Sequence, residues 1–430
     1  MDNIYEIAEV HLNINGELKK VVVTEESLSE IRANKELADC VVKIEVLDGF
    51  IKLALDRERQ NLYAFGYLYK EEKLSKFGFS DFTNLREIVL PKDLRSISEH
   101  SFDGCSNLTS VNIPDRVIEI GGSAFLGCSS LTHISLPEGM GRIGSGAFKG
   151  CTSLTHISLP ESLYEIGNEA FCGCESLADI KIPNEVRRIG YFAFKNCKSL
   201  SKVEIPSKVT ILRHSTFAGC TKLTSVVIPE SVSEIERKVF ADCTSLASVV
   251  IPKGVITISE GAFAGCKSLI YVEIPEGVKR IESSAFMGCS GLTNVSIPEG
   301  VTQIDMWAFT GCSGLISVTI PKSVKGVLSG AFRNCSSLQH VKIQNGATFI
   351  SDRAFVGCQG ITTLEIQDGL RDVGWLWFMH LKTLKTMIVP LADDELAKRL
   401  FTNFHTLERV VTKKGTFTNE HIKSGTGNIK

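Results

Sequence analysis

Cysteine is the residue type in this sequence with the widest chemistry, because a thiol can attack an electrophile, bind a metal or form a disulfide. The chain has 430 residues and 14 cysteines. Twelve of them recur every 23 residues, at positions 105, 128, 151, 174, 197, 220, 243, 266, 289, 312, 335 and 358. Zinc ligands come in pairs two to four residues apart, so this interval is not that of a zinc site.

The same interval governs the phenylalanines, which indicates a repeated structural unit. They stand at 79, 102, 125, 148, 171, 194, 217, 240, 263, 286, 309, 332, 355, 378 and 401. Proline follows another phase of the repeat, from Pro91 to Pro321 and again at Pro390. Such regularity predicts one supersecondary unit stacked on copies of itself, in about fifteen coils.

Residues 108–130 show what one unit contains. Leu108, Val111 and Ile113 are apolar and precede Pro114, which predicts a short, half-buried strand ended by a residue without an amide hydrogen. A second short extended piece covers residues 117–120. The segment 123–128 that follows predicts a single helical or 3₁₀ turn, too short to be stable without packing.

The position two residues after each phenylalanine is restricted to a few residue types. They are Asp81, Gly104, Gly127, Gly150, Gly173, Asn196, Gly219, Asp242, Gly265, Gly288, Gly311, Asn334, Gly357, His380 and Asn403. Glycine, Asn, Asp and His tolerate positive φ, so we expect a left-handed residue to close each turn.

The consensus L-x-x-V/I-x-I-P-x-x-V-x-x-I-x-x-x-A-F-x-G-C resembles the BspA-like class of leucine-rich repeats over residues 62–411. The resemblance implies a right-handed leucine-rich-repeat solenoid with a parallel β-sheet on one face. It also implies a family dominated by surface-associated, adhesive microbial proteins.

Within such a solenoid, the cysteines and phenylalanines form columns. The first members of these columns are Phe102, Phe125, Phe148, Phe171, Cys105, Cys128, Cys151 and Cys174. The cysteine column continues as Phe82 at one end and as Leu381 and Phe404 at the other. An apolar residue therefore suits the position, which predicts a structural ladder of buried, reduced thiols. Scattered disulfides, metal binding and catalysis stay open as alternatives.

Function should lie in the variable, outward positions of the predicted sheet. Val227, Val250 and Tyr271 fall on successive coils, with Glu204 and Glu273 beside them. An aromatic residue with apolar neighbours and a charged rim has the composition of a binding hot spot. The alternative is that valine simply favours strands.

His133, His156 and Asp179 are consecutive in one outward column and could chelate a metal. We expect no metal, because duplication of near-identical units explains the two histidines. No G-x-S-x-G or H-E-x-x-H motif is present. We therefore expect no catalytic residue, no enzyme activity and no cofactor.

The remaining residues predict three regions. Residues 1–60 predict a small α+β N-terminal capping domain, 61–411 the solenoid, and 412–430 a flexible polar tail. The net charge of -2 does not favour nucleic acid, and no 18-residue apolar run suggests a membrane span.

The sequence therefore predicts a monomeric, non-catalytic protein-binding or adhesion module. Its partner is a protein, which the resemblance implies to be a host or neighbouring-cell surface protein. A carbohydrate-binding surface protein and an intracellular scaffold are the alternatives. No signal peptide is visible, which favours the cytoplasm, whereas the family resemblance implies the cell surface or secretion.

Overall fold

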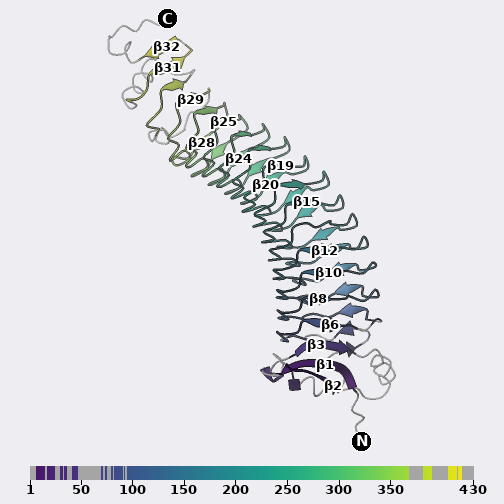
Figure 1. Ribbon diagram of the computed structural model, residues 1–430. Helices are drawn as coiled ribbons and strands as arrows, with labels where there is room; N and C mark the ends of the chain where they lie inside the picture. The colour runs from purple at the N-terminus through teal and green to yellow at the C-terminus, as the bar shows by residue number, and fades with distance from the viewer. Residues whose placement is uncertain are drawn as a thin grey trace. The chain divides into compact units, whose positions relative to one another are not determined.

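The computed structural model forms two compact units, residues 1–223 and 224–430. It describes residues 6–14, 17–24, 30–31, 33–35, 41–46, 69–70, 73–74, 79–80, 82–90, 92, 94–367, 381–389, 405–413 and 415–418. Both units consist of stacked coils with parallel strands, and the residues that the structure describes form about 13 turns with almost no helix. This confirms the predicted leucine-rich-repeat fold (Figure 1).

In the first unit, each coil gives a strand to one or both of two rows of strands. We call these rows the first and the second sheet, and the hydrogen bonds divide each row into several shorter sheets. The first sheet contains β6 (Glu87–Val89), β8 (Ser110–Val111), β10 (His133–Ser135), β12 (His156–Ser158) and β15 (Lys202–Glu204). The second contains β7 (Ser96–Ile97), β9 (Glu119–Ile120), β11 (Arg142–Ile143), β13 (Glu165–Ile166), β14 (Arg188–Ile189) and β16 (Ile211–Leu212). Strands of neighbouring coils pair in parallel between equivalent residues, such as His133 with His156.

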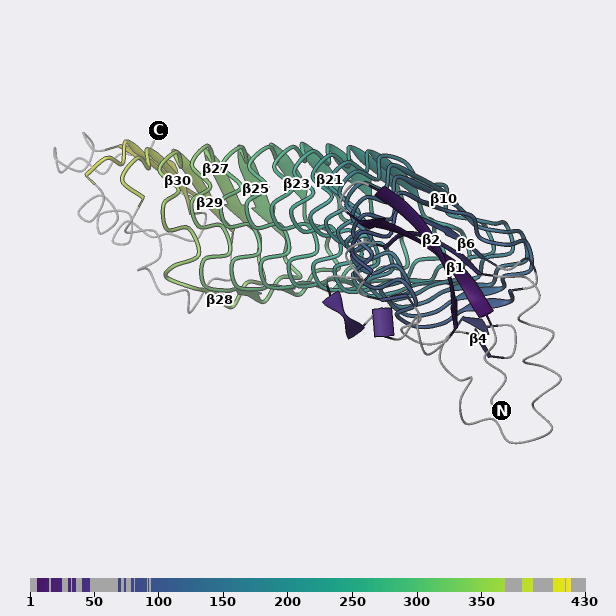
Figure 2. The same cartoon turned by 60° about the horizontal axis from the view of Figure 1, so that its bottom comes forward.

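The second unit repeats this arrangement, with its two sheets on opposite sides of the coils (Figure 2). The first sheet has β17 (Ser225–Val227), β19 (Ser248–Val250), β21 (Tyr271–Glu273), β23 (Asn294–Ser296), β25 (Ser317–Ile320), β27 (His340–Ile343), β29 (Thr363–Ile366), β30 (Thr386–Ile388) and β31 (Arg409–Thr412). The second has β18 (Glu234–Ile235), β20 (Thr257–Ile258), β22 (Arg280–Ile281), β24 (Gln303–Ile304), β26 (Gly326–Val327) and β28 (Phe349–Ile350).

The third side of each coil is a run of turns rather than a helix. The amide of Leu126 donates to the carbonyl of Ser123 at 3.1 Å, and that of Cys128 donates to Phe125 at 3.2 Å. These are the i to i+3 bonds of a 3₁₀ turn. The turn cannot extend into a helix, because Ser123 and Gly127 both have positive φ.

Two left-handed columns therefore run along the turns, of which the sequence predicted one. The predicted column is confirmed at residues 104, 127, 150, 173, 196, 219, 242, 265, 288, 311, 334 and 357. Its other members, Asp81, His380 and Asn403, lie outside the described residues. The second column comprises His100, Ser123, Gly146, Glu169, Phe192, Ser215, Lys238, Gly261, Ser284, Trp307 and Gly330.

The core is a set of columns of like residues. Successive phenylalanines stack, as in Phe125 on Phe148, with ring centroids 5.3 Å apart and 2° between ring planes. Leucine, valine, isoleucine and alanine columns are buried around them. Offset stacking and full burial of one aromatic side chain per coil make this column a major source of stability.

Close approach of the coils explains one glycine position of the first unit. A Cβ on Gly144 would lie 2.5 Å from the carbonyl carbon of Gly121 and 2.6 Å from the nitrogen of Gly122. We therefore expect Gly144→Ala to lower the free energy of unfolding by about 1–3 kcal/mol, as overpacking does. Urea denaturation would measure the change. Gly326→Ala is the control, because its Cβ would meet nothing closer than Leu328 at 3.8 Å. If Gly144→Ala and Gly326→Ala lowered the free energy of unfolding equally, close approach of the coils would not explain the glycine at position 144.

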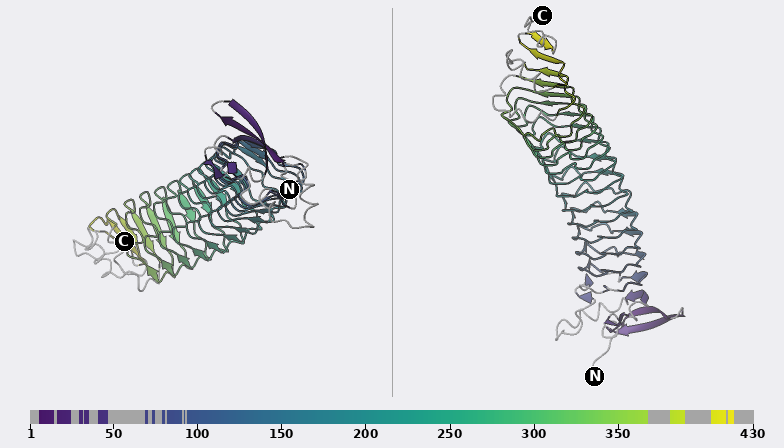
Figure 3. Two further views of the ribbon diagram at one scale, coloured as in Figure 1. Left: turned by 90° about the horizontal axis from the view of Figure 1, so that it is seen from below. Right: turned by 90° about the vertical axis from the view of Figure 1, so that its left-hand side faces the viewer.

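The ends of the chain carry antiparallel pairs (Figure 3). β1 (Glu6–Ile14) pairs with β2 (Glu17–Thr24) and with β3 (Val41–Val46), and β3 pairs in parallel with β6. Short strands β4 (Tyr69–Lys70) and β5 (Lys73–Leu74) pair in antiparallel fashion, and β5 pairs in parallel with β7. The predicted flexible tail needs one correction, because β32 (Gly415–Thr418) pairs with β31 and buries Phe417.

Candidate functional site

The cysteine column contains free thiols in a hydrogen-bonded, buried setting. Cys128 donates its thiol hydrogen to the carbonyl oxygen of Phe102 at 3.2 Å, and Cys266 makes the same bond to Phe240. Burial raises the pKa of Cys151 and of Cys289 to about 12. These thiols stay protonated near neutral pH and out of reach of solvent, so the column is built for packing rather than nucleophilic chemistry.

The cysteine outside this column has a different environment. Cys172 is half-buried, and burial raises its pKa while Lys149 and Lys195 oppose that rise. Cys40 lies outside the described residues.

The two histidines of the metal hypothesis lie side by side but bond to their own strands. His133 and His156 are register partners in β10 and β12. Nδ1 of His133 is 3.1 Å from the hydroxyl of Thr132, and Nε2 of His156 is 3.3 Å from that of Ser158. Asp179 is exposed but belongs to no described strand. Among the described residues, no three His, Cys, Asp or Glu side chains gather as metal ligands would.

Exposed apolar side chains gather instead on the first sheet of the second unit. The side chains of Val227, Val250 and Tyr271 are 59%, 70% and 46% exposed. β19 and β21 align Ser248 with Tyr271 and Val250 with Glu273. Three of the proposed binding residues and Glu273 therefore share one outward surface.

Two further isoleucines extend this surface, and the sequence interpretation missed them. Ile270 and Ile316 are 57% and 46% exposed. The amide of Thr293 donates to Ile270 at 3.1 Å, and the amide of Ile316 donates to Thr293 at 3.2 Å. The signal was an isoleucine just before the strand, at a position where most coils carry a polar residue. We call the five residues Val227, Val250, Ile270, Tyr271 and Ile316 the apolar face.

The first unit differs at the equivalent positions, except that β6 presents Val89, which is 43% exposed. β10 and β12 present histidine and serine outward, and β15 presents Lys202 and Glu204. Glu204 is exposed and belongs to this unit, so it is not assigned to the apolar face. Large apolar side chains at several neighbouring outward positions are therefore a feature of the second unit.

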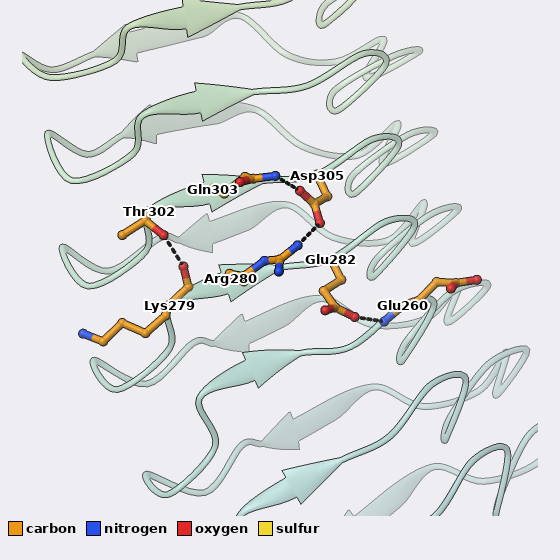
Figure 4. Close-up of polar contacts among 7 residues, drawn as sticks. All are labelled: Glu260, Lys279, Arg280, Glu282, Thr302, Gln303 and Asp305. Atoms are coloured by element: carbon orange, nitrogen blue, oxygen red, sulfur yellow. Dashed lines mark hydrogen bonds and ion pairs between the residues drawn. The ribbon is translucent and has the colours of Figure 1, made fainter.

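The second sheet carries polar contacts that link one coil to the next (Figure 4). Arg280 donates to Asp305 at 3.1 Å, and Gln303 donates to the other carboxylate oxygen of Asp305. The hydroxyl of Thr302 donates to the carbonyl of Lys279 at 3.0 Å. These groups satisfy one another along the stack, which indicates a structural role for this sheet.

None of the described helical residues forms a segment long and apolar enough to cross a lipid bilayer. The search of curated proteins found no match.

A family described as "BspA type Leucine rich repeat region (6 copies)" matches residues 72–198, 141–270 and 256–385. A leucine-rich repeat protein from Bacteroides ovatus is similar in structure, with 24% identity and a TM-score of 0.63, over 90% of this chain and 100% of that one. A leucine-rich cell surface protein from Faecalibacterium prausnitzii has 28% identity and a TM-score of 0.51, over 73% and 96%. The chain belongs to the BspA-type leucine-rich repeat family.

Proposed function

We propose that this chain is a non-catalytic binding module that holds a protein partner on the apolar face. The observation that carries the proposal is the exposure of five large apolar side chains on four of five successive coils. Contiguous exposed apolar surface marks interaction sites in soluble proteins, and an aromatic residue among aliphatic ones is typical of an interface centre.

The scaffold supports the proposal because it holds these side chains rigidly. Each lies on or next to a strand whose opposite side is buried, as with Val249 beneath Val250 and Val272 beside Tyr271. Little conformational entropy is lost when a partner docks on a preformed surface. Similarity to a bacterial cell surface protein supports a role in adhesion.

The test is loss of a captured partner when the apolar face is changed. We expect the unaltered protein to retain a protein from whole-cell and host-matrix extracts, and Val227→Lys/Tyr271→Ala to weaken its binding at least about tenfold, a loss of the size hot-spot truncation causes. His156→Ala/Ser158→Lys is the matched control, because these residues have the equivalent strand positions in the first unit.

The affinity of each variant for the captured protein would be measured by surface plasmon resonance. A partner that binds the apolar-face variant as well as the control variant would exclude this face. Retention of glycans alone would instead favour the carbohydrate-binding alternative.

A further inference from the structure

We propose that the cysteine column is an array of latent modification sites, at which a small-molecule disulfide reacts with a thiol only after the coil that holds it has opened. The adduct then prevents that coil from closing. This inference goes beyond the proposed function and does not depend on the apolar face. It concerns the column cysteines at 105, 128, 151, 174, 197, 220, 243, 266, 289, 312, 335 and 358.

In the folded chain the column thiols are shielded from reagents in solution. They are reduced and fully buried, except that Cys358 is 3% exposed. Burial is the main cause that raises the pKa of the Cys220 and Cys266 thiols, so very little nucleophilic thiolate is present near neutral pH. A disulfide reagent therefore reaches these sulfur atoms only when a coil opens.

The thiols also link neighbouring coils. The Sγ atom donates to the carbonyl oxygen of the phenylalanine 26 positions earlier, over 2.9 to 3.3 Å, at positions 105, 128, 151, 174, 197, 220, 266, 289, 312, 335 and 358. Opening of a coil breaks this bond. A sulfur atom that has formed a mixed disulfide carries no hydrogen with which to make it again.

Neither packing nor hydrogen bonding requires a thiol at this position. The column continues as Phe82 and Leu381, which are buried although they have no thiol. The carbonyl oxygen of Phe263 accepts from the Cys289 thiol at 3.1 Å, but it also accepts from the amide of Cys266 at 3.2 Å. What cysteine adds to a buried apolar residue is reactivity once the coil is open.

The reaction at an opened coil is thiol–disulfide exchange. The exposed thiol loses its proton, and the thiolate attacks one sulfur atom of the small disulfide. The S–S bond of the reagent breaks, and its other half leaves as a thiolate that takes up a proton. The chain gains one mixed disulfide and the solution gains one small thiol, so the small disulfide is the only oxidant needed.

The closed coil has no room for the added group. Phe263, Cys266 and Leu269 are fully buried and joined by backbone hydrogen bonds within one coil. Even extra methylene groups destabilise a well-packed core, and an adduct adds more atoms than that. Modification therefore turns a reversible opening into a covalent change that lasts until a reductant removes the adduct.

The test is the rate at which glutathione disulfide modifies each cysteine of the full chain near neutral pH, followed by mass spectrometry of its peptides. Cys172 is half-buried and is the internal reference, because the reagent reaches it in the folded chain. We expect Cys220 and Cys266 to react at least about hundredfold more slowly than Cys172, because coils in the core open rarely. Urea below the unfolding transition should accelerate both column thiols, because it favours open states.

The decisive variant is Phe263→Ala, which loosens the coil of Cys266 and its contact with the next coil. It should accelerate modification of Cys266 and Cys289 at least about tenfold, because it lowers the free energy of opening. Phe349→Ala is the control, since Phe349 is 51% exposed and outside the column. Cys128, in the first unit, should keep its rate in both variants. The urea series tests the same step on the unaltered chain.

Hydrogen exchange tests whether the adduct holds a coil open. Chains modified at Cys266 and Cys289 in urea should exchange the backbone amides of these coils rapidly after the urea is removed. Dithiothreitol should restore slow exchange. The variant Cys266→Ala/Cys289→Ala, given the same treatment, should recover slow exchange at these coils without dithiothreitol.

Three results would overturn the proposal. The column thiols are not latent if Cys220 and Cys266 react as fast as Cys172 in the folded chain. Opening of single coils is not the route if neither urea below the transition nor Phe263→Ala accelerates Cys266. The adduct does not hold the coil open if modified and unmodified chains exchange these amides equally slowly.

Discussion

Phe263→Ala is expected to lower the free energy of unfolding by about 3–5 kcal/mol, the range found for large-to-small changes in well-packed cores. Phe263 is fully buried and stacks on Phe240 at 5.6 Å and on Phe286 at 5.4 Å. The change leaves a cavity between two rings that adjacent coils hold in place. The stacking contribution of both neighbouring pairs is lost as well.

Urea denaturation followed by circular dichroism would measure this loss. Phe349→Ala is the control, because Phe349 lies outside the stack with 51% of its surface exposed and should cost less than about 1 kcal/mol. If Phe263→Ala lowered the free energy of unfolding as little as the control does, the phenylalanine column would not be a major source of stability.

The second large effect is a loss of stability at alkaline pH. Burial raises the pKa of Cys151 and Cys289 from 9.0 to about 12, and the pKa values of Cys174 and Cys220 are raised by the same cause. Above pH 9 the unfolded chain releases these protons while the folded chain retains them. The stability is therefore complete below pH 9 and falls as the pH rises toward 12.

Each thiol of this kind adds up to about 1.4 kcal/mol per pH unit to the decline, so the column acts collectively. Urea denaturation under reducing conditions from about pH 8 to about pH 10.5 would give the slope. Cys151→Ala and Cys289→Ala each remove one such proton. Each variant should be less stable than the unaltered protein at neutral pH, and the difference should shrink as the pH rises. If the free energy of unfolding of a variant and of the unaltered protein fell in parallel as the pH rises, burial of the thiol would not be the cause of the decline.

The repeat made much of the fold predictable, because the period shows which residues share a column. Residue type at each repeated position predicted the buried phenylalanines and cysteines. It also predicted the left-handed residue two positions after the phenylalanine. The second left-handed column did not, since its members include Phe192 and Trp307, which disfavour positive φ. Hydrogen bonds between coils hold these residues in place, such as that from the amide of Phe192 to His214 at 3.0 Å.

The candidate site was predictable only in part. Valine at 227 and 250 and tyrosine at 271 stood out because they interrupt two columns of mostly polar residues. Ile270 and Ile316 stand just before their strands, and only their exposed fractions in the folded chain show that they reach the surface.

The hydrogen bonds that join residues about 23 positions apart have a mechanical consequence. Every coil within a unit is held by its immediate neighbours, so a pull on the chain loads one interface at a time rather than a whole sheet. The outermost coil should yield first and release about 80 Å of extended chain. A cell attached through such an array would be held by a tether that lengthens in small steps under strain and shortens again when the strain ends.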